Sequence, residues 1–140
     1  MTGSAIPRSA GVYAVLLEPP ESRFLERSVG GHFKHKDPTV PVAALEAKWM
    51  PGTPILYIGR ASNLEGRIKL LARYGRGEPV AHQGGRYLWQ LEQHDRLVVG
   101  WRLEDDPVTA EAALLEDFEL TLGALPFANL VRGARPVTLV

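Results

Sequence analysis

Three short runs of apolar, aromatic and β-branched residues constrain the fold most, because each has the composition and length of a β-strand. They are residues 11–17 (GVYAVLL), 55–58 (ILYI) and 97–103 (LVVGWRL). The first run ends before Pro19 and Pro20, and the second ends at Gly59. Because proline and glycine commonly end strands, we expect a small sheet of three strands.

Two further segments carry apolar residues at helical spacing. The first follows Ser62 and Asn63, either of which can cap a helix, and it runs until Gly75. The second begins at Pro107, which suits the first turn of a helix, and ends by Gly123. The order of strand, long connection, strand, helix, strand and helix predicts one α/β domain, with a small three-stranded central sheet flanked by helices.

Length and composition agree with a single domain over residues 1–140. A chain of 140 residues is long enough for one hydrophobic core and too short for two ordinary domains. It contains no cysteine, which excludes disulfides and thiolate metal sites. Residues 1–10 hold no apolar run, so we expect neither a secretory signal nor a membrane span there. We therefore expect a cytoplasmic protein without a membrane partner.

Charge is unevenly distributed, although 16 basic and 16 acidic residues cancel over the whole chain. Residues 60–102 contain eight Lys or Arg and four Asp or Glu, whereas residues 103–120 contain seven acids and no base. An electropositive middle segment suits a phosphate-binding surface, and two solvated faces of opposite sign would give the same pattern. Charge alone does not decide between these interpretations.

Five short motifs occur in order along almost the whole chain. They are GVY at residues 11–13, YIG at 57–59, the Asn63-Leu64 pair with Arg67, EAALLE at 111–116 and PFAN at 126–129. Together they resemble the motifs of the GIY-YIG nuclease superfamily. The resemblance implies a GIY-YIG-like fold and a metal-dependent endonuclease, a hydrolase that cuts phosphodiester bonds in nucleic acid. We expect DNA as the substrate and Mg²⁺ or Mn²⁺ as the cofactor.

A second interpretation belongs to another class of function. A catalytically silent domain of the same family could serve as a nucleic-acid or protein-binding module. The enzyme is favoured because the motifs include a carboxylate, which a binding module does not need.

Hydrolysis of a phosphodiester needs an activated water, a proton for the leaving oxygen and stabilisation of charge on the phosphoryl oxygens. Glu116 follows two leucines and precedes Leu120 by four residues, so we expect it on the apolar side of its helix. One carboxylate and several waters can hold Mg²⁺. We therefore predict that Glu116 is the catalytic carboxylate and the metal ligand.

The remaining predicted catalytic residues are Arg67, Tyr13, Tyr57 and Asn129. The planar fork of Arg67 fits two phosphate oxygens and suits transition-state stabilisation. Tyr13 and Tyr57 offer hydroxyls, although core packing is an equal alternative for Tyr13. Tyr57 is the preferred general base, provided that Arg67 or a metal-bound water lowers its pKa from about 10. Asn129 is expected to position its neighbours.

Two departures from the family pattern affect these predictions. Many members carry a histidine where this chain has Leu71, so His82 and Tyr74 are the candidates for protonating the leaving oxygen. The stretch at residues 21–53 also separates the two tyrosine motifs and is too long for a simple connection.

This stretch, which we call the insertion, includes a predicted short helix at residues 42–49. Lys34 and Lys36 could bind phosphates, and Phe33 could stack on a base, so we expect a substrate-contacting lobe. The alternative is a lid that packs Phe33 and Trp49 on the sheet. The predicted nucleic-acid-binding residues are Arg60, Arg73, Tyr74, His82, Arg86, Lys34 and Lys36.

Overall fold

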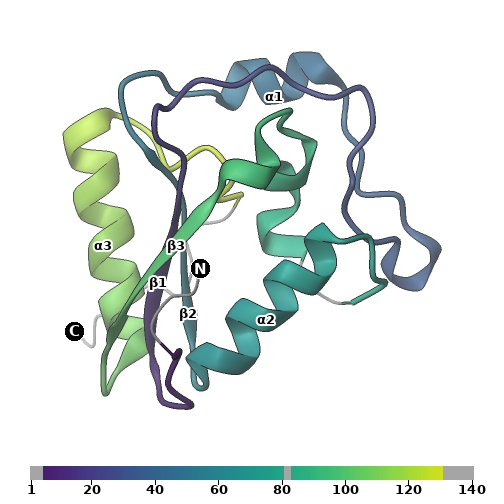
Figure 1. The fold of residues 1–140 in the computed structure, drawn as a ribbon. Helices are drawn as coiled ribbons and strands as arrows, with labels where there is room; N and C mark the ends of the chain where they lie inside the picture. The colour runs from purple at the N-terminus through teal and green to yellow at the C-terminus, as the bar shows by residue number, and fades with distance from the viewer. Residues whose placement is uncertain (1–4, 81–82, 131–140) are drawn as a thin grey trace, which may run out of the picture.

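The computed structural model describes residues 5–80 and 83–130, and its centre is a three-stranded antiparallel sheet. The strands are β1 (Gly11–Leu16), β2 (Ile55–Ala61) and β3 (Val98–Leu103), in the order β2-β1-β3 (Figure 1). Tyr13 on β1 lies opposite Gly59 on β2 and Trp101 on β3. The prediction of an α/β domain with three strands is confirmed.

Three α-helices accompany the sheet: α1 (Val42–Lys48), α2 (Leu64–Gly75) and α3 (Pro107–Leu122). The side chain of Asn63 caps α2 by accepting a hydrogen bond from the Gly66 amide, and Asp106 caps α3 in the same way. Gly123 ends α3 with a positive φ of 87°, which glycine adopts without strain. Short 3-10 helices lie at η1 (Phe33–His35), η2 (Gln83–Gln90) and η3 (His94–Arg96).

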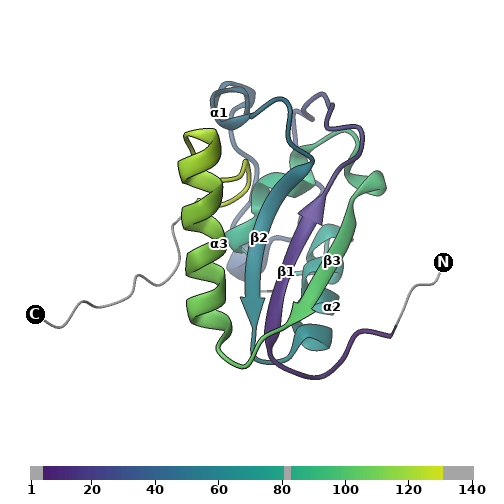
Figure 2. The same cartoon turned by 90° about the vertical axis from the view of Figure 1, so that its left-hand side faces the viewer.

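Helices α2 and α3 cover opposite faces of the sheet (Figures 1 and 2). The larger core cluster lies on the α2 side and includes Tyr13, Leu64 and Ile68. The smaller cluster lies on the α3 side and joins Ile58 to Leu115 and Phe118. Both helices pack against β1 and β2. None of the helices in the described part of the chain is long and apolar enough to cross a membrane.

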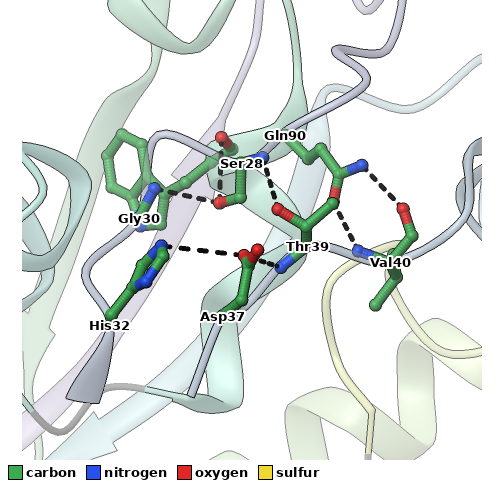
Figure 3. A network of polar contacts seen from close by, with 8 residues as sticks. Ser28, Gly30, His32, Asp37, Thr39, Val40 and Gln90 are labelled. Carbon is green, nitrogen blue, oxygen red and sulfur yellow. Dashed lines mark hydrogen bonds and ion pairs between the residues drawn. The ribbon is translucent and has the colours of Figure 1, made fainter. Parts of the chain in front are cut away.

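The insertion folds back onto the domain and is held there by Gln90, whose side chain is fully buried. Gln90 Nε2 donates to the carbonyls of Leu25 and Val40 at 2.9 and 2.8 Å. Its Oε1 accepts from the Val40 amide at 3.0 Å (Figure 3). Trp49 packs on Phe127 with 5.1 Å between ring centroids. Trp49 is therefore packed against the core, as the lid alternative expects, although its partner Phe127 lies in the C-terminal segment and not in the sheet.

We predict that Gln90→Ala lowers the free energy of unfolding by about 2 to 4 kcal/mol, because it leaves buried backbone groups of the insertion without partners. Urea denaturation measures this change. Gln93→Ala, three residues away, is the control and should change the free energy by less than about 0.5 kcal/mol. Equal effects of the two variants would contradict the anchoring role of Gln90.

Candidate functional site

A cavity of about 1040 Å³ lies beside β2, between the N-terminal parts of α2 and α3. Side chains from β1, β2, α2, α3, η2 and the C-terminal PFAN segment border it, among them Tyr13, Tyr57, Arg60, Arg67, Arg86, Glu111 and Asn129. These positions are far apart in the sequence. Antiparallel pairing of β1 with β2 brings the first two together, and the helices that follow β2 and β3 add the arginine and the carboxylate.

The two tyrosines are buried side by side on the α2 face of the sheet, with Tyr13 2% and Tyr57 8% exposed. Their ring centroids are 6.0 Å apart. The Tyr13 ring lies against the backbone of Gly59, where a Cβ would come within 2.5 Å of the ring. The glycine of the YIG motif is therefore required, because any side chain there would displace Tyr13.

The two hydroxyls differ in acidity. Burial raises the pKa of Tyr13, and the neighbouring Tyr57 raises it further, while the charge of Arg67 opposes both effects. Burial also raises the pKa of Tyr57, but the charge of Arg67 and a hydrogen bond with Tyr13 lower it. Because the bond between the tyrosines favours ionisation of Tyr57 and disfavours that of Tyr13, Tyr57 is better suited to accept a proton.

Asn129 is 5% exposed and joins the C-terminal segment to β2. Its Nδ2 donates to the Ile58 carbonyl and its Oδ1 accepts from the Ile58 amide, both at 2.9 Å. The Ala128 amide also donates to the Leu56 carbonyl at 2.8 Å. Both ends of the Asn129 amide are thus bonded to backbone, which agrees with the predicted positioning role.

The carboxylate at the cavity is Glu111, and the prediction that Glu116 lies on the apolar side of its helix is wrong. Glu116 is exposed, whereas Glu111 is 7% exposed and borders the cavity. The buried residues of α3 are Glu111, Leu115 and Phe118, four and three positions apart. Five helical residues separate the two glutamates by about 140° around the axis, so they cannot share a face. The four-residue spacing from Glu111 to Leu115 was the available sequence signal, and the prediction did not use it.

Glu111 is paired with Arg60, whose Nη1 lies 2.6 Å from Glu111 Oε1. The Glu111 side chain is 9% exposed and that of Arg60 is 38% exposed, so the carboxylate is shielded while the guanidinium reaches solvent. A carboxylate removed from water needs a cation or hydrogen-bond donors. Arg60 supplies both here.

Glu111 and the two tyrosine hydroxyls offer oxygen donors of the kind that Mg²⁺ prefers. The described residues include no group of three or more His, Cys, Asp or Glu that could hold a metal ion. Glu111 is the acidic side chain that borders this cavity, so a divalent cation bound there would depend on Glu111 and water, a donor set that fits a magnesium ion that keeps most of its hydration.

The predicted nucleic-acid-binding residues fall into separate places. Arg60 and Arg86 border the cavity, and Arg73 is exposed and pairs with Glu78 at 2.9 Å. Tyr74 is 1% exposed, so the prediction that it contacts nucleic acid is wrong for this structure. Its ring lies under the insertion, where a Cβ at Gly30 would come within 2.6 Å of it.

Two further predicted positions are exposed, and one cannot be placed. Lys34 and Lys36 lie at the exposed tip of the insertion and are not among the cavity residues. His82 lies outside the described residues. Leu71 is 3% exposed and belongs to the core.

Sequence reasoning also missed Gly84, which borders the cavity. A Cβ on this residue would lie 3.1 Å from the Tyr57 hydroxyl. The glycine pair at 84 and 85 was the available signal, because glycine permits close approach of backbone to a site.

Comparisons with known proteins give no match. No protein-family model matches the sequence, and no curated protein or solved structure is significantly similar to it.

We predict that the free energy of unfolding falls as the pH rises above about 10, the ordinary pKa of tyrosine. The folded pKa of Tyr13 is raised, so the unfolded chain loses this proton first and alkaline pH favours unfolding. Urea denaturation at increasing pH measures the decline. Tyr13→Phe should make the decline shallower, whereas Tyr87→Phe, outside the cavity, should keep it. Identical slopes in all three proteins would contradict this origin.

Proposed function

We propose that this chain is a GIY-YIG endonuclease that hydrolyses phosphodiester bonds in nucleic acid, with DNA as the expected substrate and Mg²⁺ or Mn²⁺ as cofactor. The observation that carries the proposal is the convergence of Tyr13, Tyr57, Arg67 and Glu111 on one cavity. Core packing alone does not require two tyrosines, an arginine and a buried carboxylate at the same opening.

The cavity residues can divide the reaction among them. The Arg67 guanidinium can donate to two oxygens of the scissile phosphate and stabilise the charge that develops on them. The Tyr57 hydroxyl is the candidate to accept a proton from the attacking water, helped by the charge of Arg67. Glu111 is the residue that would hold the divalent cation, and a bound cation supplies Lewis-acid polarisation of a phosphate oxygen.

One observation favours the alternative of a catalytically silent binding module. The ion pair with Arg60 already neutralises Glu111, so a cation must compete with a guanidinium for the same carboxylate. Three arginines, Arg60, Arg67 and Arg86, border the cavity and would bind phosphate even without hydrolysis. The two functions are distinguished by whether bound nucleic acid is cut.

We predict that Glu111→Gln reduces metal-dependent cleavage by about a hundredfold or more, because it keeps the shape of the side chain and removes its charge. Plasmid, single-stranded DNA and RNA are incubated with Mg²⁺, Mn²⁺ or chelator. Glu116→Gln is the matched control, a glutamate on the exposed side of the same helix, and should cut like the wild type.

Loss of cleavage in Glu116→Gln with retention in Glu111→Gln would overturn the assignment of the carboxylate. A wild-type protein that binds nucleic acid without cutting it under any of these conditions would support the silent module.

We predict that Arg67→Lys reduces turnover by about 10²- to 10³-fold, since an ammonium cannot reproduce a planar fork at two phosphate oxygens. Single-turnover cleavage rates measure the effect. Arg73→Lys is the control on the same helix, because Arg73 is exposed and paired with Glu78, and its rate should stay near that of the wild type. A fall of less than about tenfold for Arg67→Lys would leave Arg67 a supporting role only.

A further inference from the structure

Strand β3 differs from the other two strands because the principal helices pack mainly on β1 and β2. It forms the edge of the sheet next to β1, on the side farthest from α3 (Figure 2). All six of its residues are exposed, including Val98 at 57%, Leu103 at 54% and Val99 and Trp101 at 36% each. An apolar strand exposed to this extent is a typical site of strand pairing with another chain.

The outer edge of β3 also offers unused backbone groups. The Glu104 amide donates to the Ala10 carbonyl on the β1 side. Because hydrogen-bonding direction alternates along an antiparallel strand, Val99, Trp101 and Leu103 point their amides and carbonyls outward. No strand pairs with this edge among residues 5–80 and 83–130. The opposite edge of the sheet, on β2, is covered by Ala128 and Asn129.

We propose that β3 pairs with β3 of a second copy of this chain, in antiparallel orientation, to form a two-fold symmetric dimer with a continuous six-stranded sheet. The strand is followed by three acidic residues, Glu104, Asp105 and Asp106. Parallel pairing would place these acids beside their counterparts, whereas antiparallel pairing separates them. Since β2 is covered, each copy has one edge to offer and assembly ends at two.

Side-chain complementarity selects the register. A two-fold axis through Gly100 places Val99 opposite Trp101 of the second copy, an aromatic and β-branched pair of the kind that stabilises sheets. The same register places Leu97 opposite Leu103 of the second copy. An axis through Trp101 would instead set Leu97 against Asp105. The cavities border β2, so they lie at the two far ends of the joined sheet and stay open.

The register is tested by disulfide trapping. Because the chain contains no cysteine, any disulfide must involve the introduced residue. In the proposed register Gly100 lies directly opposite Gly100 of the second copy, as a non-hydrogen-bonded pair. The Cα atoms of such a pair are about 4.5 Å apart, within the range for a disulfide. A Cβ at this position meets only Leu16, at 3.9 Å. Under mild oxidation Gly100→Cys should form a covalent dimer.

Val98→Cys is the matched control on the same face of β3. In the proposed register the two Val98 positions are four residues apart along the strands, about 13 Å, too far for a disulfide. Cross-linking of Val98→Cys as fast as Gly100→Cys, or of neither variant, would overturn the register.

The dimer itself is tested by sedimentation equilibrium of the full chain over a range of concentrations. The wild type should be dimeric, and Val99→Lys should raise the dimer dissociation constant about tenfold or more, because it places charge in the apolar row. Leu120→Lys on α3, where the leucine is 76% exposed, should leave the constant unchanged. Circular dichroism melting confirms that the variants fold. A wild type that stays monomeric at every concentration would overturn the proposal.

Discussion

The contact between the Tyr13 ring and the backbone of Gly59 fixes the arrangement on which the rest of the structure depends. It requires β1 and β2 to pair in the register that sets these residues opposite one another. A slip of one residue would turn every side chain of a strand to the other face of the sheet, and would move Tyr57 away from Tyr13. The same register places the start of α2 so that the charge of Arg67 acts on both hydroxyls.

Asn129 covers the outer edge of β2, which would otherwise expose unpaired backbone groups. The side-chain amide of Asn129 forms hydrogen bonds with the backbone carbonyl and the backbone N–H of Ile58, as a residue on a neighbouring strand would. This contact closes β2 and at the same time completes the wall of the cavity. The candidate site and the covered edge therefore share one residue, and the cavity lies on the β2 side of the sheet while β3 is exposed.

Local signals predicted the helices well, because caps depend on neighbouring residues. Asn63 caps α2, Pro107 begins α3 and Gly123 ends it, each where the sequence indicated. The predicted end of the second strand at Gly59 is wrong, because β2 runs to Ala61 and uses Gly59 to make room for the Tyr13 ring. The other errors concern burial, which depends on tertiary packing. Glu116 was assigned from the adjacent leucines, although helical spacing relates Glu111 to Leu115. Tyr74 is buried because the insertion docks over it, and no local pattern specified that contact.

The Arg60 and Glu111 pair would couple the binding of a cation at the cavity to the binding of a phosphate. Removing one partner from a buried ion pair is costly unless another charge replaces it. The guanidinium is the more exposed partner, so it can leave for solvent or for a phosphate while Glu111 stays in place. An approaching phosphate would attract Arg60 and thereby release the carboxylate for the cation. A phosphate and a cation would then bind cooperatively, because each lowers the cost of separating the ion pair for the other.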